Sequence, residues 1–501
     1  MKRARPFLIA VVLGAVVLPG AHAFSFSDMA FSISGSLEGS AILRLDRDTP
    51  KEDPSTELGL ELRGDLASWC SLKVVAQGLN DGTVMDPTSG KLFKEFDTIY
   101  QDRNPSINID EAYVDFYGGS VDVRLGIQKF AWGRLDEINP TDNLNTEDFS
   151  QGGTNDESER KIGVPSLKGN VYTDLVNVEL AWIPRYVPYR MPTPEERWFP
   201  GVFKPPALID TGTAIGGIPT RTTYRDIDLP PFTLENSQGG IRLMKYVKGW
   251  DLSISYYTGY DIMPLSRADV DLVVSLESLL ALDYLLRADI TLEPRIERMH
   301  VYGMDFTTTV GSFTLRGEGA YFRGKYYNRK MDSLLADEVS RQRQEELFRG
   351  FLTEFLASGG AASRQTFRFE PDLGLQLDSF KYGLGIDYLH GDTTVSAQCI
   401  QEFIPDYDVD KPVYFNKKGL DTLLTFQVKQ FFLQNTMEID LSFAYNIEYR
   451  GILVKPNFKY RFTDDLHLTL SALIIDGPYP DSLLGQFKDN DQVAASLKCY
   501  F

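Results

Sequence analysis

The chain has 501 residues, of which 43% are hydrophobic and 12% aromatic, and its formal net charge is −19. This acidity argues against nucleic acid and against an anionic membrane surface as partners, because both repel a negatively charged protein. The four histidines and three cysteines show no zinc or catalytic spacing, and each cysteine alternates in phase with apolar neighbours.

Residues 1–23 are expected to form a cleavable secretory signal. Residues 2–5 carry three positive charges, residues 7–18 form an apolar run, and Ala21-His22-Ala23 places small residues at both cleavage positions. Such a segment is too short and wrongly flanked to serve as a membrane span. The mature chain, 24–501, is expected to form a single domain.

Beyond the signal, apolar and polar residues alternate with a period of two, which indicates β-strands. The pattern recurs in segments of about ten residues, the length that a tilted strand needs to cross a bilayer. Eighteen strands are predicted, at 31–46, 56–67, 70–80, 108–117, 121–131, 165–172, 176–183, 236–247, 250–260, 296–309, 312–323, 379–389, 393–403, 420–430, 436–446, 450–461, 465–476 and 490–501.

The connections between these strands alternate between short turns and long segments, an asymmetry typical of outer-membrane barrels. The long segments are 81–107, 132–164, 185–235, 261–295, 324–378 and 404–419. The final strand ends on Phe501 and resembles the signal that the barrel-assembly machinery recognises. We therefore predict an all-β fold, a transmembrane antiparallel barrel of about 18 strands in the outer membrane of a Gram-negative bacterium. Strand 490–501 would close on 31–46, membrane lipid and lipopolysaccharide would surround the barrel, and an even strand number would leave both termini in the periplasm.

Two helices are expected in the long connections. One covers 332–357, where Leu347, Phe348, Phe351, Leu352 and Phe355 recur at helical spacing. The other covers Val270 to Leu286. Both helices either decorate the surface or form a lid or plug. In the second case Phe351 and Phe355 would pack into the barrel mouth.

Charged and polar residues on the face opposite the apolar one are predicted to line the lumen. Charges of both signs need water or partners there, and eighteen strands leave room for an aqueous channel. The predicted pore-lining residues are Arg44, Glu57, Glu61, Arg63, Glu111, Asp115, Arg124, Gln128, Arg316, Glu318, Lys381, Asp387, Lys429, Lys455, Lys459 and Arg461.

The loop 132–164 follows the fifth strand and is rich in carboxylates. By analogy with general porins it is expected to fold into the barrel and narrow the channel. Its constriction residues would be Asp136, Glu137, Asp142, Glu147 and Asp148. A net-negative loop inside a low-dielectric wall would favour cations over anions, with a preference that shrinks at high salt.

Two hairpins carry a resemblance to a known family. The segments are Val123 to Gln128 with Ala131-Trp132-Gly133 and Asn139 to Asn145, and Gly383 to Tyr388 with Ser396-Ala397-Gln398. They resemble a porin-like outer-membrane family labelled as a domain of unknown function, distantly similar to alginate-export barrels. The resemblance implies the barrel and its location but no substrate. Glu147-Asp148 departs from the continuation typical of the family.

The sequence favours a porin-like channel for passive passage of polar or charged solutes. No nucleophile elbow, phosphate loop or His-Glu-x-x-His motif occurs, so neither an enzyme nor a cofactor is expected. Two alternatives stay open. One is a transporter for a hydrophobic compound or a polymer exporter, with Val270 to Leu286 as an apolar port. The other is a barrel-anchored adhesin or scaffold.

Overall fold

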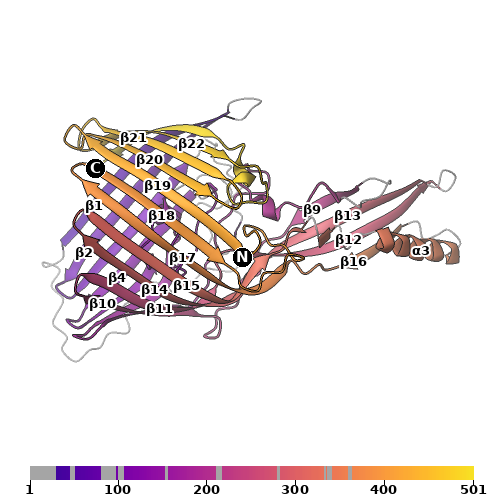
Figure 1. Ribbon diagram of the computed structural model, residues 1–501, viewed down its shortest axis with the longest axis horizontal. Helices are drawn as coiled ribbons and strands as arrows, with labels where there is room; N and C mark the ends of the chain where they lie inside the picture. Colours follow the sequence, from indigo (N-terminus) through magenta and orange to yellow (C-terminus); the bar gives the residue numbers. More distant parts are fainter. Residues whose placement is uncertain are drawn as a thin grey trace, which may run out of the picture.

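The structure is a computed structural model that describes residues 30–45, 51–80, 98–99, 106–152, 156–209, 217–278, 283–331, 334–335, 341–358 and 364–501. The predicted signal peptide lies outside these residues. Two parts are visible: a barrel, and a slender extension that projects from one of its ends (Figure 1).

The barrel is a closed sheet of 18 strands, each antiparallel to its neighbours. All the predicted strands are present, and the expected closure is confirmed, because β1 pairs with β23 over Ser36–Arg44 and Gln492–Tyr500. The strands are β1 (Ala30–Arg44), β2 (Lys51–Ala67), β3 (Cys70–Asn80), β4 (Ser106–Tyr117), β5 (Val121–Gln128), β6 (Val164–Tyr172), β7 (Asn177–Ile183), β10 (Gln238–Val247), β11 (Trp250–Tyr260), β14 (Arg298–Val310), β15 (Phe313–Asn328), β17 (Gly374–His390), β18 (Thr393–Phe403), β19 (Leu420–Phe432), β20 (Met437–Asn446), β21 (Ile452–Arg461), β22 (Leu466–Asp476) and β23 (Gln492–Tyr500).

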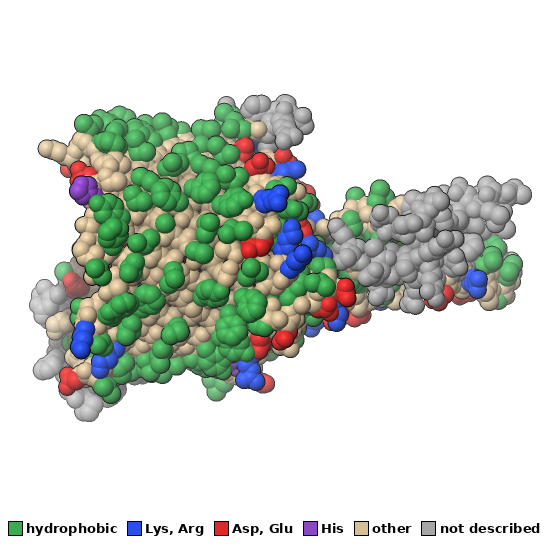
Figure 2. Space-filling model, in the orientation of Figure 1, with side chains coloured by type: hydrophobic (Ala, Val, Ile, Leu, Met, Phe, Trp, Pro, Cys, Tyr) green, Lys and Arg blue, Asp and Glu red, His purple; other side chains and the backbone are tan. Residues whose placement is uncertain are grey.

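The outer surface of the barrel is apolar. Alternate residues such as Met304, Leu384 and Leu497 are exposed on it, and hydrophobic side chains cover the barrel up to a border of charged residues where the extension begins (Figure 2). Closure leaves no unpaired sheet edge, and an apolar exterior around a polar interior suits a bilayer. The protein is therefore an outer-membrane β-barrel.

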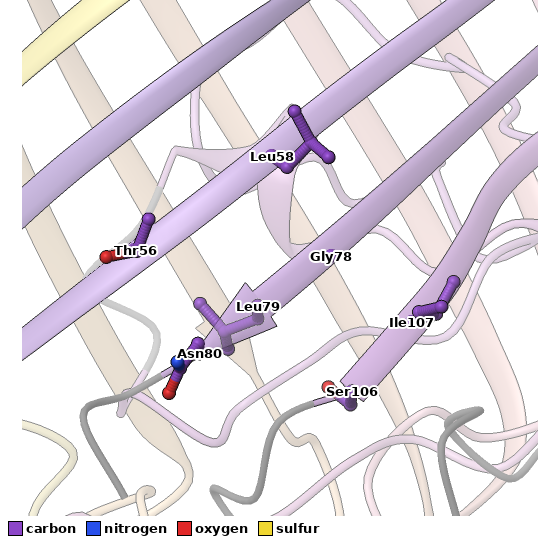
Figure 3. Close-up of a pocket in the computed structure, with 7 residues that line it drawn as sticks. All are labelled: Thr56, Leu58, Gly78, Leu79, Asn80, Ser106 and Ile107. Carbon is purple, nitrogen blue, oxygen red and sulfur yellow. The ribbon is translucent and has the colours of Figure 1, made fainter.

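A shallow apolar groove of about 240 Å³ interrupts this surface near one rim. Gly78 on β3 lies between Leu58 on β2 and Ile107 on β4, and because it has no side chain the neighbours border a depression (Figure 3). The groove opens toward the lipid side and belongs to the membrane-facing surface.

Leu441 tests this orientation, because it lies at the centre of β20 and is 42% exposed. Leu441→Arg is expected to lower the free energy of unfolding by about 2–4 kcal/mol, since a charge at the bilayer midplane is costly. The neighbouring Ser442 faces inward, where its hydroxyl contacts Asp440. The matched variant Ser442→Arg should change stability little. Urea unfolding in lipid vesicles measures both, and equal losses would contradict the assigned faces.

The extension is a second sheet of five strands, in the order β16, β12, β13, β9 and β8. Three long connections, all at the same end of the barrel, supply these strands. They are β8 (Leu208–Ile209), β9 (Ile218–Tyr224), β12 (Leu265–Ser278), β13 (Asp283–Arg295) and β16 (Arg364–Phe369), and the same connections contain η2 (Gly201–Phe203) and α3 (Arg341–Ala357). One face of the sheet packs on buried Met331, Leu334 and Leu335.

The helix expected at Val270 to Leu286 is wrong, because β12 and β13 form an antiparallel hairpin there. Ala268, Val270, Leu272 and Val274 are buried at every second position of β12, which is strand periodicity. Val273 is buried as well, so Leu272-Val273-Val274 is continuously apolar, and such a short apolar run does not separate a buried strand from a helix. The residues of the hairpin described as buried pack within the extension, not against the lipid-facing surface of the barrel.

The second expected helix exists as α3, and the part of 332–357 outside 334–335 and 341–357 lies beyond the described residues. Phe351 and Phe355 are buried and contact each other at 6.2 Å between ring centroids. However, α3 lies at the far end of the extension, next to β16 and away from the barrel (Figure 1). The expected packing of these rings into the barrel mouth is therefore wrong. Among the helices described, none is both long and apolar enough to cross a membrane.

Candidate functional site: an infolded loop and the lumen beside it

The loop 129–163, which connects β5 and β6 and includes α1 (Glu157–Arg160), crosses the interior of the barrel. Arg134 Nε donates to Asp305 of β14 at 3.1 Å. Gln398 of β18 donates to Asp136 at 2.8 Å. These wall residues alternate with side chains exposed on the outer surface, so the loop reaches from β5 to the inner face of β14–β18.

Glu318 of β15 holds the start of the loop. Its carboxylate accepts hydrogen bonds from the backbone N–H groups of Arg134 (2.8 Å), Leu135 (3.2 Å) and Thr141 (2.6 Å) and from the Thr141 hydroxyl (2.7 Å). The residue is 5% exposed. Gly133 has a φ of +89°, and a Cβ there would lie 2.6 Å from the carboxylate, so this close approach requires glycine.

The two hairpins with family-like motifs meet at this point. Leu135 packs over Gly383 and Gly385 of β17, where a Cβ on Gly383 would lie 2.6 Å from Leu135 Cδ1. Arg316 bridges Asp136 of the loop and Asp387 of β17, at 2.6 Å and 2.7 Å. The glycines therefore form a recess in the wall that accepts the loop.

An apolar core lies between the loop and the wall beneath it. The loop contributes Phe130, Trp132, Leu144 and Ile162, and the wall contributes Val164, Ala181, Ile183, Tyr257, Met299, Val301, Ala320 and Phe322. Trp132 Nε1 also donates to Glu179 of β7 at 2.6 Å. The loop thus fills the side of the lumen next to β6–β15.

The five acids expected to form the constriction all have basic partners. The pairs are Asp136–Arg316 (2.6 Å), Glu137–Arg160 (2.9 Å), Asp142–Lys161 (2.6 Å), Glu147–Arg160 (3.1 Å) and Asp148–Arg190 (3.4 Å). Burial raises the pKa of Asp142 to about 6, against the opposing effect of Lys161. The net charge that these five acids present to a solute is therefore small.

Most of the predicted pore-lining residues are paired along the inner wall. The pairs are Arg44–Asp53, Arg63–Glu61, Lys73–Glu111, Arg124–Asp115, Arg316–Asp387, Lys429–Glu438, Lys429–Asp440 and Lys455–Asp156. Gln128 is buried and donates to the carbonyl of Ser166. Glu57 lies opposite Glu38 in the β1–β2 register, and Lys381 opposite Glu402 in the β17–β18 register.

A polar cavity of about 520 Å³ lies in the lumen between the loop and the strands β20–β23 and β1. The predicted residues Lys455, Lys459 and Arg461 line it. The residues His467 and Thr469 of β22 also line it, and sequence reasoning did not assign them to the lumen. Their alternation with the outward-facing leucines of β22 is the signal that could have found them.

Charged residues face this cavity from two sides. The wall strands carry the bases Lys455, Lys459, Arg461 and Lys498 and the acids Glu38 and Glu438, while Asp156 and Glu159 belong to the loop. Asp156 lies 3.2 Å from Lys455, and Glu38 lies 3.2 Å from Lys498. The cavity therefore has a wall in which bases outnumber acids, and an acidic loop across from it.

A family model described as "Protein of unknown function (DUF1302)" matches residues 71–501. The chain belongs to this family. The DUF1302 barrel is also similar in fold to Acinetobacter baumannii OccAB1, with 10% identity, coverage of 96% of this chain and 98% of that chain, and a TM-score of 0.48. For Pseudomonas aeruginosa OccK2 (OpdF) in complex with glucuronate, the identity is 7%, the coverage 94% and 98%, and the TM-score 0.47. No curated protein matches the chain.

Cys70, Cys399 and Cys499 of the DUF1302 barrel are free thiols. Within the described residues, no group of three or more His, Cys, Asp or Glu is arranged to hold a metal ion.

Proposed function

We propose that this protein is an outer-membrane channel for the passive passage of polar or charged solutes. The observation that carries the proposal is the exposure of Lys459 and Arg461, which face the cavity rather than the lipid. Ammonium and guanidinium groups left without partners need water around them. An aqueous lumen supplies that water, and eighteen strands are wide enough to enclose it.

In this proposal, solutes pass along one side of the lumen and not through its centre. The loop and its apolar core occupy the side next to β6–β15, while the cavity lies beside β20–β23 and β1. Solutes would pass between the basic wall and the acidic edge of the loop. This arrangement favours solutes that are small and polar over polymers or apolar compounds.

The preference for cations stays a prediction. Basic partners offset Asp136, Glu137, Asp142, Glu147 and Asp148, so we expect the preference for small inorganic cations to be weak. Its remaining source is the exposed loop acid Glu159, together with Asp156, whose charge Lys455 offsets at 3.2 Å.

Recordings from single barrels in planar lipid bilayers test the function. The full-length mature protein is expected to give stepwise conductance and, across a salt gradient, a small reversal potential of the sign for cations. Asp156→Asn with Glu159→Gln should reduce that potential, and high salt should abolish it by screening. Asp408→Asn replaces an acid of another loop whose side chain is 44% exposed. This variant should leave the reversal potential unchanged. Correctly folded barrels without conductance would overturn the proposal.

A second candidate is a barrel-anchored scaffold, and one observation favours it. The extension is an ordered sheet that projects beyond the barrel end with the long connections (Figure 1). Its polar face carries ordered ion pairs, including Arg368–Asp271 and Arg287–Asp289, both 2.8 Å. A channel that only conducts needs no such structure, so the extension could serve recognition in addition to passage.

A further inference from the structure

Three basic residues form a row across the inner wall. Arg461 of β21 lies directly opposite His467 of β22, and His467 lies directly opposite Lys498 of β23. Directly opposite residues in antiparallel strands have Cβ atoms about 5 Å apart. All three side chains line the cavity, so the row is continuous and accessible from the lumen.

A second row lies one step further along the same strands. Lys459 is opposite Thr469, and Thr469 is opposite Ser496. Residues two apart on a strand share a face and are about 7 Å apart, so this row runs beside the first. The two rows place a second ammonium group and two hydroxyl donors next to Arg461.

Among the bases that line this cavity, Lys459 and Arg461 are the two for which the described residues show no ion pair within 4 Å. Both are exposed to the lumen. Lys455 and Lys498, in contrast, contact Asp156 and Glu38 at 3.2 Å. Glu438 of β20 lies opposite Lys459 and also lines the cavity, so the positive charge of the two rows is partly compensated there and is strongest at Arg461.

We infer that these two rows form a binding site for the anionic group of a small organic solute, a carboxylate or a phosphate. The inference rests on the proposed channel function and names a substrate class for it. Arginine binds such groups through two parallel N–H donors, and lysine, threonine and serine supply further donors. The acidic Glu159 across the cavity would hold any positive group of the same solute on the loop side.

Blocking of single-channel current tests this site in the full-length mature protein. Succinate and inorganic phosphate are added separately, to distinguish carboxylate from phosphate recognition, and glucose serves as the uncharged reference. At least one of the two anions is expected to interrupt the current, while glucose at equal concentration leaves it steady. In Lys459→Gln with Arg461→Gln the half-blocking concentration should rise at least tenfold.

Matched variants distinguish block by binding at this site from a general effect of net charge on the current. Lys411→Gln with Lys488→Gln also removes two positive charges, but from exposed loop positions outside the cavity, and should change the half-blocking concentration less than threefold. The conservative Lys459→Arg with Arg461→Lys should retain block. Circular dichroism checks that each barrel is folded.

Failure of the channel proposal and failure of the binding-site proposal give different results. Wild-type barrels that do not conduct would remove the channel proposal itself. Barrels that conduct but are blocked by neither anion would overturn the binding site and leave the channel standing. Equal weakening of block in the lumen and loop variants would also overturn it, because the effect would then come from net charge.

Discussion

Replacing Glu318 with Ala is expected to raise the conductance of single barrels and to make it fluctuate. Glu318 accepts three backbone N–H groups and one hydroxyl from the loop. Leaving a buried donor without a partner costs about 1–3 kcal/mol for each group. The substitution removes the acceptor for all four at once, so the loop should leave its place against β15 for part of the time and widen the path.

The conservative Glu318→Gln keeps one carbonyl oxygen as an acceptor and should have a smaller effect in the same recordings. Glu235→Ala removes an exposed acid from a different loop and should leave the conductance as in the wild type. A folded Glu318→Ala barrel with unchanged, steady conductance would show that the loop does not narrow the path.

Replacing Asp305 with Ala is expected to cause the largest loss of stability. The Asp305 side chain is 1% exposed and lies 2.9 Å from Arg242, which is 6% exposed. It also contacts Ser253 and the loop residue Arg134. Removing one partner of a buried ion pair leaves an uncompensated charge and costs about 3–5 kcal/mol.

Urea unfolding in phospholipid vesicles measures this loss. The exposed pair Asp408–Lys411, with side chains 44% and 53% accessible, supplies the control. Asp408→Asn should cost less than about 1 kcal/mol, because solvent screens surface ion pairs. A loss of similar size in both variants would mean that the Asp305 cluster does not stabilise the barrel.

The barrel itself was predictable because a transmembrane strand must alternate along its whole length. One face meets lipid and the other meets the lumen, so β20 and β23 are visible in the sequence as uninterrupted alternation. Each short turn then marks the boundary between two strands. The same requirement explains why the closing pair, β1 with β23, followed from the order of strands.

The extension was not predictable in the same way, because its strands do not face lipid. In β12 both faces are covered in places, as burial of Val273 and Val274 shows, and local alternation is lost. The sequence also did not reveal which bases form ion pairs with the loop acids. Arg316 lies 180 residues after Asp136, and no local pattern connects two residues on opposite sides of a lumen.

The contacts of the loop also constrain the order in which the molecule is built. Those that dock it join residues far apart in the chain: 177 residues separate Thr141 from Glu318, and 262 separate Asp136 from Gln398. Such distant contacts form late, since much chain must be ordered first. The loop can take its final place only when β15 and β18 are in the sheet. Docking of the loop is therefore a late step in folding, after its own flanking strands β5 and β6 have paired.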